Sequence, residues 1–234
     1  MLSPAVGFRA HGIAVFKAFY MIKVACYIDG FNIYHAIDDA NRAQRGALNH
    51  LKWVNLSLLM KEFTDPNHHE VVAVKYFTAY PSWKPDREVR HREYVKALKH
   101  YGVQEILGQF KSKDAYCKLC KGTYRAMEEK ESDVNIAMHL IADAFQSIFD
   151  QAFLVTNDSD LLGPVRMVRE LFPKKRLKII SPPYRRHSKE LWAAATHRAK
   201  ILQEHLERCL MPATEILADG SEGFRRPVEY DPPA

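Results

Sequence analysis

Short apolar runs alternate with amphipathic stretches along most of the chain. Five apolar runs predict strands, at residues 22–28, 71–78, 103–107, 152–156 and 177–180. Helical spacing of apolar residues predicts helices over residues 33–43, 51–63, 86–101, 133–149, 160–171, 188–195 and 197–210. Strands that alternate with helices form parallel sheets covered on both faces. The pattern therefore predicts a three-layer α/β/α fold around a mainly parallel central sheet.

The remaining segments lack such periodicity. Residues 108–130 are polar and are predicted to be irregular, although a small ribbon there could form one wall of a cleft. The first 20 residues are interrupted by charge, fit neither a membrane span nor a signal peptide, and leave Met21 as a candidate natural start. The predicted organisation is an N-terminal extension (1–20), one domain (21–195), a C-terminal helix (196–210) and a flexible tail (211–234).

Aspartates follow two of the predicted strands. Asp29 comes directly after the first strand, and Asp158 and Asp160 follow the strand at residues 152–156. In parallel α/β sheets, ligands bind beyond the carboxyl ends of the strands. A single aspartate there could equally cap the next helix. Residues 156–160 hold more polar groups than one cap needs, and this favours a functional site.

Asp133 lies on the predicted core-facing side of its helix. It shares that helical face with five apolar residues, at offsets of three, four, seven, eight and eleven: Ile136, Ala137, Leu140, Ile141 and Ala144. A carboxylate so placed needs a cation or hydrogen bonds to offset its desolvation. Clustered carboxylates favour Mg²⁺ or Mn²⁺, and such a metal can activate water. We expect a metal site at this edge, formed by Asp29, Asp133, Asp158 and Asp160.

Three segments carrying these aspartates resemble known motifs. Residues 27–32, 129–134 and 155–161 are similar, in this order, to the three motifs of NYN-domain proteins, the LabA-like branch of the PIN-like nuclease superfamily. The resemblance spans about residues 21–195. Thr156-Asn157 stands where the family often has Ser-Gly, which leaves the carboxylates in place.

The resemblance implies a PIN-like Rossmannoid fold and metal-dependent cleavage of single-stranded or structured RNA. The family's acidic positions correspond to Asp29, Asp133, Asp158 and Asp160, and its asparagine corresponds to Asn32. The implied role of Asn32 is to orient a ligand carboxylate or the attacked phosphate.

The charge of the chain fits an anionic partner. Lys and Arg total 34 against 28 Asp and Glu, which gives a net charge of +6. A basic surface attracts nucleic acid, although a plain solvated surface is the alternative. Candidate RNA contacts lie after the last predicted strand, before Asp133 and after the second strand: Tyr184, Arg185 and Arg186; Lys130; and Trp83 with Lys84, Arg87, Arg90 and Arg92.

Cys117 and Cys120 have the spacing of half a zinc site, which needs four ligands. His91, His100 or a second subunit could complete it, and a reduced pair in a turn is the alternative. The two other cysteines lie in apolar segments, so no disulfide framework is indicated and a cytoplasmic location is expected. Apolar residues of the last helix serve either the core or a homodimer contact: Ile201, Leu202 and Leu206.

Three functions fit these observations to different degrees. A metal-dependent endoribonuclease explains the aspartates and the basic surface together. A non-catalytic RNA-binding or regulatory module on the same scaffold is the second hypothesis, but a pure binder gains nothing from acids that repel phosphate. A phosphoryl-transfer enzyme would often carry a second acid two residues after Asp29, where Phe31 stands.

Overall fold

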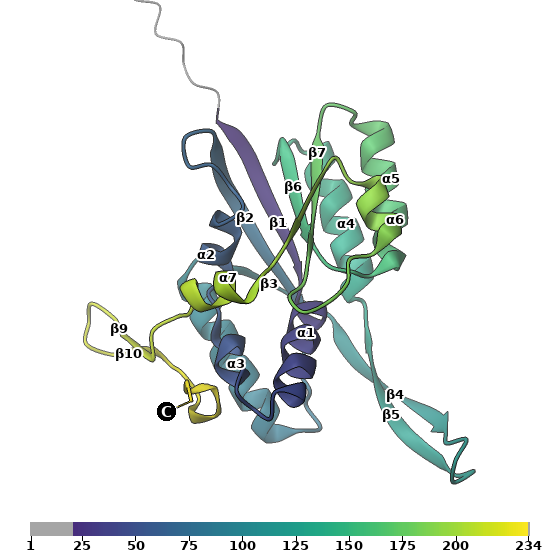
Figure 1. The fold of residues 1–234 in the computed structure, drawn as a ribbon, viewed down its shortest axis with the longest axis vertical. Helices are drawn as coiled ribbons and strands as arrows, with labels where there is room; N and C mark the ends of the chain where they lie inside the picture. Colours follow the sequence, from purple (N-terminus) through teal and green to yellow (C-terminus); the bar gives the residue numbers. More distant parts are fainter. Residues whose placement is uncertain (1–20, 234) are drawn as a thin grey trace, which may run out of the picture.

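The computed structural model describes residues 21–233, and the predicted extension at residues 1–20 lies outside them. A six-stranded parallel sheet has the order β3-β2-β1-β6-β7-β8, with helices on both faces (Figure 1). The predicted α/β fold with a parallel central sheet is confirmed. The strands of this sheet are β1 (Ile22–Asp29), β2 (His69–Thr78), β3 (Gln104–Leu107), β6 (Gln151–Val155), β7 (Arg176–Ser181) and β8 (His197–Lys200).

Two apolar clusters hold the layers together, because successive side chains of β1 point to opposite faces of the sheet. Val24, Cys26 and Ile28 pack under one set of helices, while Ala25 and Tyr27 pack under the other. The first set is α1 (Gly30–Ala43), α2 (Leu56–Lys61), α3 (Pro85–His100) and α7 (Gln203–Arg208). The second set is α4 (Ser132–Phe145), α5 (Leu162–Leu171) and α6 (Lys189–Ala194). None of the helices described is long and apolar enough to cross a membrane.

The direction in which successive strands are added to the parallel sheet changes between β1 and β6. The strands β2 and β3 lie on one side of β1, and β6, β7 and β8 lie on the other. Ile28 of β1 is level with Val155 of β6, so the residues that follow both strands emerge side by side. Ligands bind in doubly wound sheets at such a switch point. Asp29 and the segment beginning at Thr156 therefore meet where the fold places its binding sites.

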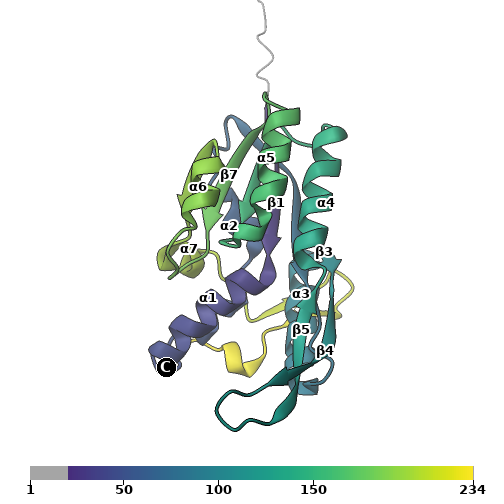
Figure 2. The same ribbon diagram turned by 90° about the vertical axis from the view of Figure 1, so that its right-hand side faces the viewer.

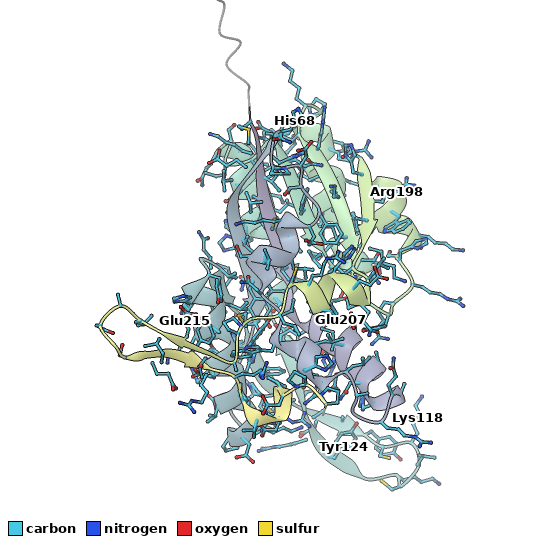
Figure 3. All side chains as sticks on the ribbon, turned by 60° about the vertical axis from the view of Figure 1, so that its left-hand side comes forward. His68, Lys118, Tyr124, Arg198, Glu207 and Glu215 are labelled. Carbon is cyan, nitrogen blue, oxygen red and sulfur yellow. The ribbon has the colours of Figure 1, made fainter. Side chains whose placement is uncertain are left out.

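Residues 109–130 are not irregular and form the small ribbon given above as the alternative. They form an antiparallel hairpin of β4 (Gln109–Tyr116) and β5 (Thr123–Lys130), which projects from the body of the protein (Figure 2). Lys118 and Tyr124 lie on the part of this hairpin that is far from the sheet (Figure 3). Most of its side chains are exposed on both faces. The hairpin therefore lacks the apolar alternation that reveals a half-buried strand.

The segment after residue 196 also differs from the prediction. Residues 197–200 form the edge strand β8 beside β7, so only the end of the predicted 196–210 helix is helical. Ile201 and Leu206 are buried in the core, while Leu202 is 47% exposed. The core alternative is thus confirmed for two of the three apolar residues left open above.

The segment predicted to be a flexible tail carries structure. It forms a hairpin of β9 (Thr214–Ile216) and β10 (Glu222–Arg225) and the short 3-10 helix Val228–Tyr230. Phe224 is fully buried, and its ring centroid lies 5.9 Å from that of Trp53. A few aromatic contacts fix this segment, and such isolated anchors leave no periodic signal in a sequence.

The predicted helix over residues 51–63 is interrupted. A 3-10 helix, Asn49–Trp53, precedes α2. Asn55 caps α2 because its side-chain oxygen accepts a hydrogen bond from the Leu58 backbone N–H at 3.0 Å.

Candidate active site at the switch point

Asp29 both caps α1 and faces the switch point. One carboxylate oxygen accepts the Asn32 backbone N–H at 3.0 Å. The other accepts the Asn32 side-chain amide at 2.6 Å and the Thr156 hydroxyl at 2.9 Å. Burial raises the pKa of Asp29 and outweighs these hydrogen bonds, which lower it. An ionised carboxylate has about four acceptor sites, so three hydrogen bonds leave Asp29 room for one further partner.

Thr156 connects the two strand ends. Its hydroxyl donates to Asp29 and accepts the backbone N–H of Asp158 at 3.0 Å. The backbone N–H of Asn157 donates to the side-chain oxygen of Asn32 at 3.2 Å. Asp158 then caps the 3-10 helix Ser159–Leu161. The excess of polar groups read from the sequence is thus divided between caps and a network that joins β1 to β6.

Asp133 approaches the same edge from α4. The apolar face predicted for this helix packs on the sheet, with Ile136, Leu140 and Ala144 fully buried. Asp133 lies one turn before Ile136 and is partly buried. Within residues 21–233, no group donates a hydrogen bond or forms an ion pair with its carboxylate.

The electrostatics of Asp133 show that the acidic residues converge. Burial raises its pKa to about 6, and the carboxylates of Asp158 and Asp29 add to this rise, as do Glu129 and Asp160. Like charges disfavour ionisation only at short range. Asp160 contributes least and is exposed. The charges of Asp158 and Asp29 thus act on Asp133 at the switch point, and Asp160 lies at the exposed rim.

The donor chemistry of this cluster suits a hard divalent cation. All the donors are carboxylate oxygens, the ligands that Mg²⁺ and Mn²⁺ prefer. Asp29 keeps one acceptor site, and Asp133 lacks a protein partner. Within residues 21–233, no group of three or more His, Cys, Asp or Glu side chains lies close enough together to hold a metal ion. The carboxylates therefore suit the cation by donor type and charge, and they would have to move closer together to hold it.

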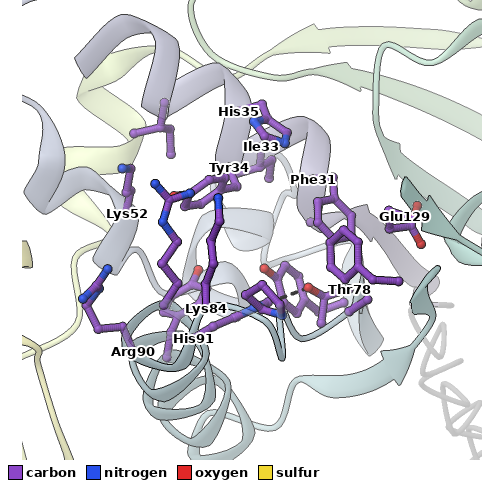
Figure 4. Close-up of a pocket in the computed structure, with 18 of the residues that line it drawn as sticks. Phe31, Ile33, Tyr34, His35, Lys52, Thr78, Lys84, Arg90, His91 and Glu129 are labelled. Atoms are coloured by element: carbon purple, nitrogen blue, oxygen red, sulfur yellow. Dashed lines mark hydrogen bonds between the residues drawn. The ribbon is translucent and has the colours of Figure 1, made fainter. Parts of the chain in front are cut away.

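A cavity of about 460 Å³ opens beside the cluster. It lies between α1, α3 and the base of the β4–β5 hairpin, and Gly30 and Glu129 both line it (Figure 4). Gly30 follows Asp29, and Glu129 is one of the carboxylates that raise the pKa of Asp133. The cavity and the acidic cluster are therefore neighbours.

The predicted RNA contacts are placed in three different ways. Trp83 lines the cavity with its ring 4.5 Å, centroid to centroid, from that of Phe110. Arg185 is ion-paired with Asp39, and Lys130 with Glu128 at 3.1 Å. Two further candidates, Tyr184 and Arg186, lie in the loop after β7. The Tyr184 hydroxyl donates to Gln203 at 3.0 Å, and the Arg186 backbone oxygen accepts the Asn157 amide at 2.7 Å.

Cys117 and Cys120 lie in the turn of the projecting hairpin. Hydrogen bonds from the backbone and side chain of Cys120 lower the pKa of Cys117. His91 and His100, the suggested partners, contact other groups, namely Thr78 and Glu215. The zinc site stays a prediction that requires ligands beyond this pair.

Sequence reasoning found the basic side of the cavity and Trp83 but missed its other aromatic walls. Trp83, Lys84, Arg87 and Arg90 belong to one basic group read from the sequence, and all four line the cavity. Phe110 and Tyr230 lie in segments predicted to be irregular or flexible, so nothing in the pattern linked them to a site.

The family model of the NYN domain matches residues 23–202. The chain belongs to the NYN domain family. The family consists generally of nucleases and hydrolases, which supports a hydrolase at a coarse level. The match does not separate branches of the NYN family, so assignment to the LabA-like branch stays a prediction.

Two proteins resemble this NYN chain. The 6-hydroxy-3-succinoylpyridine 3-monooxygenase HspA of Pseudomonas putida is 25% identical over an alignment of 182 residues, and the match covers 63% of this chain. The chain spans about half, 56%, of the length of that curated relative. The crystal structure of VPA0982 from Vibrio parahaemolyticus, a protein of unknown function, matches with a TM-score of 0.55 and 20% identity. That match covers 80% of this chain and 96% of the other and supports the fold alone.

Gly30 is predicted to tolerate no side chain. A Cβ there would lie 2.6 Å from the Phe77 backbone oxygen and 2.7 Å from the Tyr76 ring. We expect Gly30→Ala to cost about 1–3 kcal/mol of unfolding free energy, as overpacking does, measured by urea denaturation. Gly163→Ala is the matched control, because nothing lies within 4 Å of its added Cβ. Equal stability of the two variants would refute the close packing at Gly30.

His91 is predicted to make the stability depend on pH. Its ring nitrogen lies 3.1 Å from the Thr78 hydroxyl, and burial lowers its pKa to about 4. The unfolded chain binds this proton near pH 6.5, so the contribution is complete above pH 6.5 and is lost as the pH falls toward 4. At pH 5 the loss should be about 2 kcal/mol. Urea denaturation of wild type and His91→Gln at pH 7.5 and pH 5 measures the part of the pH-dependent stability that is due to His91. The same change in unfolding free energy between the two pH values in both proteins would contradict this role of His91.

Proposed function

We propose that this NYN chain is a metal-dependent endoribonuclease. One observation carries the proposal: the carboxylate of Asp133 is partly buried and unpaired within residues 21–233, and the charges of Asp158 and Asp29 at the switch point raise its pKa. Such a cluster is unfavourable for the free protein, and burial and its neighbours raise the pKa of Asp133 to about 6. A bound divalent cation would remove this penalty, which explains why the acids are placed together.

In this proposal Asp29, Asp133 and Asp158 hold Mg²⁺ or Mn²⁺. The cation would supply an activated water and would neutralise charge on the phosphodiester in the transition state. Asn32 has a positioning role, because its backbone and side-chain N–H groups fix both oxygens of Asp29. Asp160, at the rim, would add a further carboxylate to those that hold the cation.

RNA is the proposed substrate on three grounds. The family is generally one of nucleases, the chain carries a net charge of +6, and one basic residue, Arg186, lies in the loop beside the acidic edge. Arg186 is exposed, and its backbone is bonded to Asn157 beside the cluster. A strand reaching the acids could therefore contact the loop after β7.

The test is cleavage of labelled RNA and single-stranded DNA in Mg²⁺, in Mn²⁺ and in EDTA. The proposal expects cutting of RNA in either metal and none in EDTA. Asp114→Asn, an exposed carboxylate on the β4–β5 hairpin, serves as the control variant and should cut like wild type. No cutting of any substrate, with RNA binding retained in EDTA, would support the non-catalytic RNA-binding module instead.

A second candidate function follows from the cavity and the Pseudomonas putida relative. The name of that relative describes oxygenation of a pyridine derivative. The cavity here has aromatic walls and several cations, which suit a small aromatic acid. Calorimetry with 6-hydroxy-3-succinoylpyridine tests this candidate, and binding at micromolar concentration without RNA cleavage would favour it over the nuclease.

A further inference from the structure

The cavity beside the acidic cluster has the chemistry of a nucleotide site. Its volume of about 460 Å³ falls in the range typical of small-ligand pockets, about 300–1,000 Å³. Phe31, Trp83 and Phe110 form one aromatic corner. The ring centroids of Phe31 and Phe110 are 5.6 Å apart, and those of Trp83 and Phe110 are 4.5 Å apart. Flat aromatic faces are the surfaces on which unpaired bases stack.

Four cations line the cavity, and two of them lack a counter-charge. Lys52 pairs with Asp38 at 2.5 Å, and Arg90 pairs with Glu229 at 2.8 Å. Lys84 and Arg87 form no ion pair with any described residue. Two free cations beside aromatic rings point to a ligand that carries both a ring and a negative charge.

The cavity has a direction. Lys52, Lys84 and Arg90 lie on one side of it, and Phe31 and Glu129 lie on the other (Figure 4). The Phe31 side leads to the acidic cluster, because Phe31 follows Gly30 and Asp29 in the chain. The cavity therefore runs from the acids, past the aromatic corner, to the free cations.

We infer that this cavity binds one unpaired nucleotide of the RNA, adjacent to the bond cut at the acidic cluster. The base stacks in the aromatic corner of Phe31, Trp83 and Phe110, and its distal phosphate contacts Lys84 and Arg87. The inference rests on the proposed function, since it places the scissile phosphate at the acids. It makes the substrate single-stranded at the cleavage point, because a paired base cannot enter a cavity of this kind.

The experiment measures binding in EDTA, where no cleavage occurs. Fluorescence anisotropy compares a labelled eight-nucleotide single-stranded RNA, the same RNA with one abasic position scanned along it, and the matching duplex. We expect one abasic position to weaken binding about tenfold, since stacking of one base contributes about 1–3 kcal/mol. The duplex should bind more weakly than the intact single strand.

Variants assign the effect to the cavity. Trp83→Leu should weaken the intact strand about tenfold and leave the affinity of the sensitive abasic strand unchanged. Arg87→Gln should weaken both strands by a similar factor, because it removes a phosphate contact. Arg166→Gln, exposed on α5 away from the cavity, removes the same charge and controls for net charge. Circular dichroism of each variant confirms folding.

The outcomes separate this inference from the nuclease proposal. Metal-dependent cutting together with equal affinity for intact and abasic strands would overturn the proposed nucleotide site in the cavity and keep the nuclease proposal. A base-dependent affinity that Trp83→Leu abolishes, without cutting in any metal, would keep the cavity and overturn the nuclease. An equal effect of Arg87→Gln and Arg166→Gln would show that only overall charge matters, which also overturns the cavity.

Discussion

Replacing Asp133 with asparagine is expected to lower the single-turnover rate of RNA cleavage in Mg²⁺ by about 100- to 1,000-fold. The amide keeps the shape of the side chain but removes one negative charge from the cluster. Stabilisation of the transition state by a bound metal contributes several kcal/mol, and each 1.4 kcal/mol corresponds to a factor of about ten. The rate at saturating protein, with Asp114→Asn as control, is the measurement.

The stability of Asp133→Asn separates a functional role from a structural one. The carboxylate has no protein partner in the described chain, and its neighbours repel it. The variant should therefore melt in EDTA at the wild-type temperature or above it. Loss of cleavage together with a lower melting temperature would mean that Asp133 serves the fold.

The second large effect is expected at the buried ion pair between Lys75 of β2 and Asp143 of α4. Lys75 Nζ lies 2.5 Å from the Asp143 carboxylate, to which the Tyr27 hydroxyl also donates at 2.6 Å. Lys75 and Asp143 are 8% and 6% exposed. We expect Asp143→Ala to cost about 3–5 kcal/mol of unfolding free energy, because it leaves Lys75 buried without a counter-charge. Urea denaturation at pH 7.5 measures this loss.

Two further variants test whether the unpaired charge of Lys75 causes this loss of unfolding free energy. The double variant Lys75→Met with Asp143→Leu should recover much of the stability, since apolar groups of similar volume often replace buried ion pairs without loss. Glu62→Ala removes an exposed pair with Arg208 and should cost less than about 1 kcal/mol. A similar cost for Asp143→Ala and Glu62→Ala would contradict the buried-charge explanation.

The sheet and the acidic edge could be predicted because their signals are local. Buried parallel strands appear as continuous apolar runs, such as that of β6, and all of its side chains are buried. Asp133 was recognisable because Ile136, Leu140 and Ala144 fix its place on α4. The convergence with Asp29 then followed from the rule for the carboxyl ends of parallel strands.

The remaining parts of the fold could not be predicted, because their contacts join residues that are far apart in the sequence or because both faces of their strands are exposed. The β4–β5 hairpin is polar on both faces, so its strands carry no apolar alternation. β8 is short and exposed, and its residues resembled the start of the helix that follows. Phe224 is buried against Trp53, 171 positions earlier in the chain. Such pairings depend on tertiary structure and not on a local pattern.

The cavity illustrates the same limit within the site. Three of its four cations, Lys84, Arg87 and Arg90, lie where a basic group stands out in the sequence. Its aromatic walls come from α1, the β4–β5 hairpin and the segment around Tyr230. Only the folded arrangement shows that these segments meet beside Asp29.

The most direct test of the central claim is Mn²⁺ binding, measured by isothermal titration calorimetry without RNA at pH 7.5. Wild type, Asp133→Asn and the control Asp114→Asn are compared. The account predicts that wild type and Asp114→Asn bind Mn²⁺ with equal affinity, and that Asp133→Asn binds it at least about tenfold more weakly. Equal Mn²⁺ affinity of Asp133→Asn and wild type, or no Mn²⁺ binding by wild type, would contradict a metal site at this acidic edge.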